Sequence, residues 1–308
     1  MGARYGQHFL SNPRAVASIL DRFGAGPGDA VVEIGPGRGA LTMELQRSAG
    51  AFAAVEIDPE LALDLSRRIG AVMLVAARDG FAPAHPDARS EQIPSPAPLT
   101  RDALPRYLVL ADALDIRYQT LASLLGAGIG RRLRVIGNLP YSVATALIQR
   151  LLDERDLVSD AMFMVQKEVA DRLLAPPGGK EYGYLTVQLA LAASRSRVLN
   201  LGPGSFSPHP KVRSCVISLR FPPPETGFRG ADARLRALLS IAFRERRKKL
   251  ATTLARAAGL SRVEVDASLA SCGIPPDARV ETVPPETLAR LAAALSLPRA
   301  AGASNPES

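Results

Sequence analysis

The chain has 308 residues, 47% of them hydrophobic, with a formal net charge of +8 and a pI near 9.9. It has no apolar run that could span a bilayer, and its N-terminal MGARYGQHFLSN does not have the organisation of a signal peptide. Two cysteines and three histidines without metal-ligand spacing argue against a disulfide framework and against a metal site. We therefore expect a cytoplasmic, monomeric protein without metal or membrane contact, whose positive charge suits a polyanionic partner.

Short apolar runs alternate with helical patterns along most of the chain. We expect strands at 31–34, 52–57, 107–110, 133–136 and 162–165, and two later strands at 198–201 and 215–221. Strands that alternate with helices favour a mostly parallel sheet with right-handed crossovers. The pattern therefore predicts an α/β domain with a seven-stranded sheet.

Two segments interrupt this order. Residues 76–106 carry no usable periodicity and predict a long surface insertion outside the core. Its prolines are Pro83, Pro86, Pro94, Pro96, Pro98 and Pro105. Residues 222–230 are typical of a linker, and leucines recur at helical spacing after them. We therefore expect one domain over 1–222 and a small all-helical domain over 223–308.

A glycine-rich turn, GPGRGA, follows the first expected strand. Gly35 and Gly37 fit the dinucleotide fingerprint, but they equally suit S-adenosylmethionine, with Glu56 after the second strand holding ribose hydroxyls. Glu33 either organises the turn from beneath or faces water at the end of its strand. The turn alone does not separate a dehydrogenase from a methyltransferase. A dehydrogenase would also need an acid or base facing a nicotinamide, and the sequence offers no candidate.

A second turn, Gly137-Asn138-Leu139-Pro140-Tyr141, follows the strand at 133–136. It places an amide, a backbone carbonyl and an aromatic ring at the carboxyl end of a strand, where open α/β sheets keep their ligands. Such a set suits a planar amine held between two acceptors and a ring face. The alternative is an ordinary strand-to-helix turn in which Tyr141 serves packing.

Basic residues cluster at two places, which favours a nucleic-acid partner over a merely solvated helix face. One cluster precedes the second turn and contains Arg131, Arg132 and Arg134. The other lies in a later helix and contains Arg244, Arg246, Arg247, Lys248 and Lys249.

Nine motifs occur in one order along nearly the whole chain: GQHFLSNP, VVEIGPGRGALT, VEIDPEL, ADALD, GNLPYSVATALI, FMVQKEVADRLL, YGYLTVQLAL, FSPHPKVRSCVISL and AFRERRKKLATTL. The ordered set resembles the KsgA-type ribosomal RNA adenine dimethyltransferases. The resemblance implies a Rossmann-like class I fold that binds S-adenosylmethionine. The implied cofactor contacts are His8, Leu10, Gly35, Glu56, Asp112 and Asn138.

This sequence departs from the family pattern at two points. His8 stands where the family usually has Asn. The insertion lengthens the path from Glu56 to Asp112, so Asp79 becomes a competing candidate for the cofactor's adenine contact. We prefer Asp112, because LVLADALDI leads into the fourth strand without a gap. Considered alone, Asp112 fits a simple Asx turn better than a cofactor contact.

The resemblance also implies the roles of the residues around the target base. Asn138 and a carbonyl of Leu139–Pro140 would accept from an adenine amine, while Tyr141 and Phe206 would stack on the two faces of the base. Phe206 as ordinary loop packing is the alternative. Lys211 and Arg213, with the basic residues of the C-terminal domain, would bind phosphates.

The expected reaction is N6-dimethylation of two adjacent adenosines in the 3′-terminal hairpin loop of 16S rRNA, with the small ribosomal subunit as partner. Two other functions remain open. One is an erythromycin-resistance-type methyltransferase of 23S rRNA, against which AFRERRKKL and FSPHPKV argue. The other is a ribosome-assembly or nucleic-acid-binding factor with dispensable catalysis.

Overall fold

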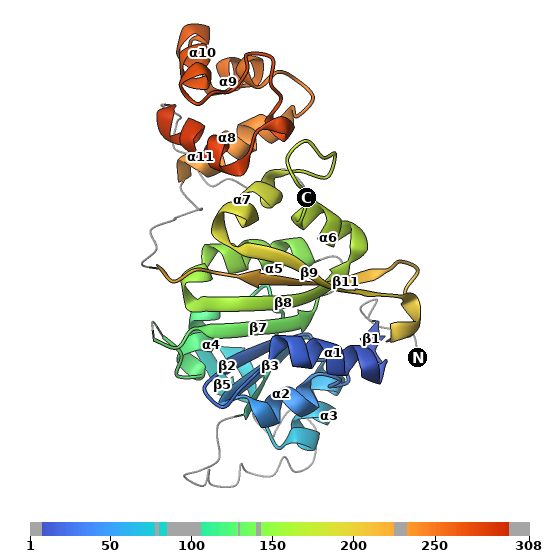
Figure 1. Cartoon of the computed structure of the whole chain (residues 1–308). Coiled ribbons are helices and arrows are strands. Elements are labelled where there is room, and N and C mark those ends of the chain that lie inside the picture. The colour runs from blue at the N-terminus through green and yellow to red at the C-terminus, as the bar shows by residue number, and fades with distance from the viewer. Residues whose placement is uncertain are drawn as a thin grey trace. The chain divides into compact units, whose positions relative to one another are not determined.

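The computed structural model describes residues 8–77, 80–84, 106–128, 130–139, 143–224 and 233–295. Within these ranges one nine-stranded sheet has the order β5-β4-β6-β3-β2-β7-β8-β11-β9 (Figure 1). Its strands are β2 (Ala30–Ile34), β3 (Ala51–Glu56), β4 (Val72–Ala77), β5 (Gly80–Pro83), β6 (Arg106–Leu110), β7 (Leu133–Asn138), β8 (Val158–Gln166), β9 (Ser194–Leu201) and β11 (Ser214–Arg220). A separate ribbon joins β1 (Phe9–Leu10) to β10 (Phe206–Ser207).

All seven predicted strands are present, and the fold class is confirmed. Six successive strands, β4, β6, β3, β2, β7 and β8, form five parallel pairs, whereas β11 runs antiparallel to β8. The sheet gains two strands that we did not predict. β4 pairs with β6, and β5 folds back antiparallel on β4. The start of the expected insertion is therefore part of the sheet, and residues 85–105 of it lie outside the described residues.

The helices of the first part are α1 (Pro13–Phe23), α2 (Thr42–Ser48), α3 (Pro59–Ile69), α4 (Tyr118–Leu124), α5 (Ala144–Asp153) and α6 (Lys167–Leu173). Local sequence explains where α1 and α3 begin. Asn12 and Asp58 accept hydrogen bonds from the free backbone N–H groups of each first turn, and a proline follows each cap. Both helices end at a glycine with positive φ, Gly24 and Gly70.

Helices cover both faces of the sheet. Figure 1 shows α1, α2 and α3 in front of the strands and α4 and α5 behind them. On the first face, Phe23 and Leu65 pack with Phe52 and Ile136 in one buried core. The carboxyl ends of the parallel strands stay clear for a site because the crossover helices occupy the faces.

The chain divides into two compact units, residues 1–170 with 196–223 and residues 171–195 with 224–308. The second unit contains α7 (Tyr184–Ala192), α8 (Ala233–Arg244), α9 (Leu250–Ala258), α10 (Arg262–Ser271) and α11 (Pro285–Ala294). We had placed α7 in the first domain. It groups with the C-terminal helices because it is buried along nearly its whole length, and Val187 and Leu191 join Leu238 and Leu288 in a shared core.

Among the described helices, none combines the length and the hydropathy that a bilayer span requires.

Candidate functional site

The glycine turn after β2 brings three segments together. Gly35 and Gly37 have φ values of 66° and 53°, in the left-handed region that favours glycine. A Cβ on Gly37 would lie 2.8 Å from the ring of Phe9, and one on Gly35 would lie 3.2 Å from the carbonyl oxygen of Asn138. Gly37 lets the ring of Phe9 from β1 pack against the turn, and Gly35 lets the turn approach the backbone at the end of β7.

Glu56, the last residue of β3, ties its strand end to this turn. Its Oε2 accepts from Gly37 N at 2.9 Å, and its Oε1 accepts from the backbone N–H groups of Ile57 and Asp58, each at 3.0 Å. Burial raises the pKa of this carboxyl, and the three backbone hydrogen bonds oppose the rise. Each carboxylate oxygen can accept about two hydrogen bonds, so Oε2 retains capacity for a ligand hydroxyl.

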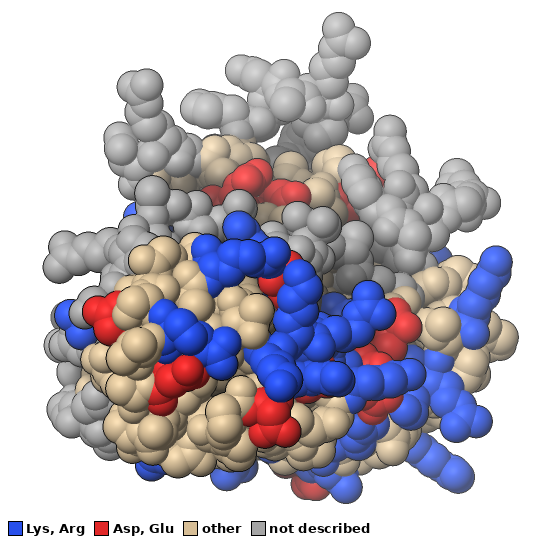
Figure 2. Space-filling model, turned by 90° about the horizontal axis from the view of Figure 1, so that it is seen from above, with Lys and Arg blue, Asp and Glu red and all other residues tan. Residues whose placement is uncertain are grey.

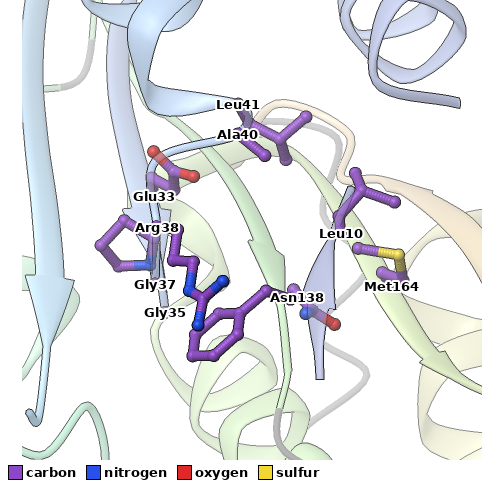
Figure 3. A pocket seen from close by; sticks show the side chains of 11 residues that line it. Leu10, Glu33, Gly35, Gly37, Arg38, Ala40, Leu41, Asn138 and Met164 are labelled. Carbon is purple, nitrogen blue, oxygen red and sulfur yellow. The ribbon is translucent and has the colours of Figure 1, made fainter. Parts of the chain in front are cut away.

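A pocket that is open to solvent lies at the glycine turn (Figure 3). It contains three of the predicted cofactor residues, Leu10, Gly35 and Asn138. Sequence reasoning missed Phe9, Arg38 and Met164, which also line it. The Arg38 guanidinium lies 4.7 Å from the centroid of the Phe9 ring, in cation–π geometry. Phe9 was adjacent to a predicted contact, and Arg38 lay inside the glycine motif, but nothing in the sequence indicated that they stack.

Asn138 is the last residue of β7, and the nitrogen of its side-chain amide is hydrogen-bonded within the protein. Its Nδ2 donates to the main-chain carbonyl of His8 at 2.9 Å. This bond leaves Oδ1 as an acceptor for another donor. His8 itself bonds through Nδ1 to the Pro208 carbonyl at 2.9 Å and is not among the pocket-lining residues. In this structure His8 serves the site through its backbone.

The beginning of the second turn is fixed by backbone contacts. Leu139 is buried, and its N–H donates to the carbonyl of Met164 at 3.0 Å. A Cβ on Gly137 would lie 2.4 Å from the carbonyl oxygen of Ile34, so β2 and β7 approach as closely as they do only with glycine there. Pro140 and Tyr141, predicted to act on the base, lie outside the described residues.

Phe206 lies in β10, opposite Leu10 of β1. Its ring is 1% exposed and packs with Leu10 and Val216 in the core of the first unit. This placement agrees with the packing alternative. Stacking on a base stays a prediction, and it would require the ring to be uncovered. Lys211 and Arg213 follow it and are exposed.

Asp112 comes two residues after the end of β6. It lies beside the end of β3, because the preceding residue, Ala111, donates its N–H to the carbonyl of Glu56 at 3.0 Å. Its Oδ1 accepts from Leu114 N at 2.8 Å, which is the Asx turn that we weighed as the alternative. It does not line the pocket described above. Contact with an adenine stays a prediction, and Asp79 lies outside the described residues.

The arginines that precede the second turn, which we counted as a sign of a nucleic-acid partner, bond within the protein. They lie at the amino end of β7, whereas Asn138 is at its carboxyl end. Arg131 donates to the carbonyls of Gly28 and Asp29, and Arg132 donates to backbone carbonyls as well. Arg134 pairs with Asp29 at 2.7 Å and with Asp160 at 2.9 Å.

The second basic cluster lies mostly in the turn between α8 and α9, although we had predicted that it lies in a helix. Arg246 pairs with Glu281 at 3.0 Å and Lys248 with Glu245 at 2.9 Å. Arg244, Arg247 and Lys249 are exposed and have no carboxylate partner within the described ranges. Figure 2 shows Lys and Arg side chains gathered on the face viewed from above, with acidic side chains among them.

Glu33, one residue before the end of β2, is 2% exposed, so the water-facing alternative is wrong. Burial raises its pKa to about 8; Thr42 opposes this rise and the nearby Glu56 carboxylate adds to it. Within the described residues, no three His, Cys, Asp or Glu side chains gather as metal ligands would.

Comparison with known proteins identifies a family whose members this chain resembles. A family model described as "Ribosomal RNA adenine dimethylase" matches residues 2–296. A protein of Methylococcus capsulatus named "Ribosomal RNA small subunit methyltransferase A" is 35% identical over 90% of this chain and 91% of its own length. A protein of the same name from Bordetella petrii is 36% identical over 95% of this chain and 94% of its own.

Solved structures support the fold. A dimethyladenosine transferase from Plasmodium falciparum superposes with a TM-score of 0.67 at 22% identity, covering 92% of this chain and 96% of its own. The 23S rRNA methyltransferase ErmE superposes with a TM-score of 0.62 at 24% identity, covering 93% of this chain and 99% of its own.

Proposed function

The chain belongs to the ribosomal RNA adenine dimethylase family, and on this premise we propose that it transfers methyl groups from S-adenosylmethionine to the N6 amine of adenine in small-subunit ribosomal RNA. We further propose two adjacent adenosines of the 3′-terminal hairpin loop of 16S rRNA as its targets. The observation that carries the proposal is Asn138, a pocket-lining amide whose nitrogen is already bonded and whose oxygen remains to accept.

The residues present fit the proposed cofactor. Gly35 and Gly37 line the pocket without side chains of their own, so a ligand there would meet the backbone of the glycine turn. Glu56 retains acceptor capacity for ribose hydroxyls, and Leu10, Gly35 and Asn138 form the wall for the methionine portion. When bound, S-adenosylmethionine supplies a methyl group on a sulfonium, which is a good leaving group. The protein therefore needs to position the amine rather than to activate it with a strong base.

Asn138 would perform that positioning. The lone pair of an adenine amine is delocalised into the ring, and acceptors beside its N–H groups favour the pyramidal form that can attack. With Nδ2 held by the carbonyl of His8, Asn138 Oδ1 is preoriented to accept from that amine. The target adenine must be unpaired or flipped out of its helix, because a stacked base hides its amine.

Arg244, Arg247 and Lys249 support an RNA substrate, because they are exposed cations without partners in the described part of the chain. Such side chains contact phosphates and contribute affinity with little base discrimination. Lys211 and Arg213 of the first unit are exposed in the same way and are proposed as further phosphate contacts.

Modification of 23S rRNA is the alternative that the fold also permits, given the likeness to ErmE. The relatives at 35% and 36% identity carry a small-subunit name, which favours the small subunit for this chain.

Incubation with tritiated S-adenosylmethionine and either unmethylated small subunits or unmethylated large subunits tests the proposal. We expect label on the small subunit only, at N6 of adenines in the 3′-terminal hairpin. Label on the large subunit would favour the alternative. Tight binding to small subunits without label would instead indicate an assembly factor.

A further inference from the structure

His8 connects the side-chain amide of Asn138 to the loop that follows β10. The main-chain carbonyl of His8 accepts from Asn138 Nδ2 at 2.9 Å, and its ring Nδ1 lies 2.9 Å from the carbonyl oxygen of Pro208. Because a carbonyl oxygen only accepts, Nδ1 carries the hydrogen of this second bond. His8 therefore contacts Asn138 through its backbone and the loop through its side chain.

The ring bond lies at the end of the short ribbon of β1 and β10. Phe9 is opposite Ser207 in this ribbon, so the register places His8 opposite Pro208. Proline has no backbone N–H and cannot donate a further ladder bond, and His8 lies outside β1. The carbonyl of Pro208 is still an acceptor, and the histidine ring donates to it. The side chain thus attaches His8 to the loop at the point where the backbone ladder stops.

This attachment fixes the carbonyl that orients Asn138. A chain segment beyond its last ladder pair frays unless it is tied down by other contacts. The amide of Asn138 can turn about χ2, and its bond to the His8 carbonyl selects the orientation in which Oδ1 faces away from His8. If that carbonyl moved, the amide would lose the partner that sets its orientation. Oδ1 would then be presented to a target amine less often.

Two other roles for the ring agree less well with the structure. A cofactor contact is the first, but His8 is not among the residues that line the pocket. Simple stabilisation of the loop is the second. The loop already contains a bond of this kind, because His209 Nδ1 lies 2.6 Å from the carbonyl oxygen of Phe206. The bond of the His8 ring differs in that the same residue also holds Asn138.

Resting on the proposed function, we propose that His8 is a positioning residue for methyl transfer. By donating to the Pro208 carbonyl, its ring holds the His8 backbone where that backbone orients Asn138 for the target amine. The ring acts through Asn138 and touches neither the cofactor nor the base. Its removal therefore lowers the rate of transfer and leaves the affinity for S-adenosylmethionine unchanged.

The geometry of the bond distinguishes the side chains that can replace the ring. The amide nitrogen of asparagine and Nδ1 of histidine are both bonded to Cγ, so asparagine can donate to Pro208 from the same position. The amide nitrogen of glutamine lies one bond further out, and alanine has no donor. His8→Asn should therefore preserve the attachment, whereas His8→Gln and His8→Ala should break it.

Single-turnover transfer to unmethylated small subunits at saturating S-adenosylmethionine tests this inference, together with calorimetry of cofactor binding. We expect His8→Ala and His8→Gln to slow transfer about tenfold to a hundredfold, because a displacement of about 1 Å at a reacting centre can cost about 10²-fold. His8→Asn should retain most of the rate. The matched control, His209→Ala, removes the other ring bond of the loop and should retain the rate as well. All four variants should bind S-adenosylmethionine as the unmodified protein does.

Weaker cofactor binding by His8→Ala, with an unchanged rate once the cofactor is saturating, would overturn the inference and make the ring a cofactor contact. An equal loss of rate in His209→Ala or in His8→Asn would also overturn it, because the bond from His8 to Pro208 would then not be the cause. The contrast between His8→Asn and His8→Gln decides the matter even where His8→Ala does not fold. Absence of transfer to small subunits by the unmodified protein would instead refute the proposed function, and the inference with it.

Discussion

The side-chain amide of Asn138 donates a 2.9 Å hydrogen bond to the main-chain carbonyl of His8, a residue 130 positions earlier in the chain. The N-terminal segment therefore orients the amide that we propose as the acceptor for the target amine. The antiparallel pairing of β1 with β10 holds that segment, with Leu10 opposite Phe206. The site is thus assembled from the beginning, the middle and the later part of the first unit.

Replacing Asn138 with Ala should lower the methyl-transfer rate roughly 10²–10³-fold, the range for removing one preorganised polar contact from a reacting centre. The fold should persist, because one partly exposed hydrogen bond contributes only about 1 kcal/mol to stability. Single-turnover transfer to small subunits measures the effect, with Asn200→Ala on the exposed face of β9 as the control. Unmodified rates in Asn138→Ala would refute the assigned role.

Arg134→Met should destabilise the protein by roughly 2–4 kcal/mol, somewhat below the 3–5 kcal/mol typical of breaking a fully buried ion pair. The reason is that Asp29 and Asp160 would both lose their partner in a half-buried site at the amino end of β7. Urea denaturation measures the change. Arg47→Met removes an exposed arginine 4.0 Å from Glu44 and should stay within about 0.5 kcal/mol. A similar loss of unfolding free energy in both variants would contradict the structural role of Arg134.

Neutralising Arg244, Arg247 and Lys249 to Gln should weaken binding to small subunits and flatten its salt dependence. The log–log slope should shrink by about 0.7–0.9 for each phosphate contact that is lost. Affinity for S-adenosylmethionine should not change, because its pocket lies in the other unit. Filter binding across a salt series provides the measurement. The control triple of Lys180, Arg262 and Arg290 removes the same charge from exposed positions of the same unit, so an equal change in slope there would refute a dedicated surface.

Glu33 should make the free protein less stable as pH rises. Its pKa is about 8 in the folded protein against an ordinary value of 4.5, so between these values the folded state holds a proton that the unfolded state releases. This contribution is fully favourable below pH 4.5, and it declines by at most about 1.4 kcal/mol per pH unit until pH 8. In thermal unfolding without ligand, Glu33→Gln should therefore gain stability relative to the unmodified protein from pH 5 to pH 8. A constant difference across that range would mean that Glu33 is already ionised.

Local patterns in the sequence determined the alternating strands and helices, the two turns at strand ends and the helical C-terminal part. These features depend on neighbouring residues: apolar runs for the buried strands, Asn12 and Asp58 as caps, and Gly35 and Gly37 for a turn with positive φ. The ordered motifs added the family, because nine of them occur in one order along nearly the whole chain.

Only the tertiary structure decided what depends on distant partners. β4 pairs with β6, and the sequence did not show that this short apolar run before the insertion joins the sheet rather than the insertion. Arg134 proved structural because Asp29 and Asp160 approach it from other strands and loops. Glu33 proved to be a buried carboxyl beside Glu56, and Phe206 a core side chain, because burial depends on which elements pack above them. A sequence states which groups are present, but the charge and accessibility of each group depend on neighbours that only folding brings together.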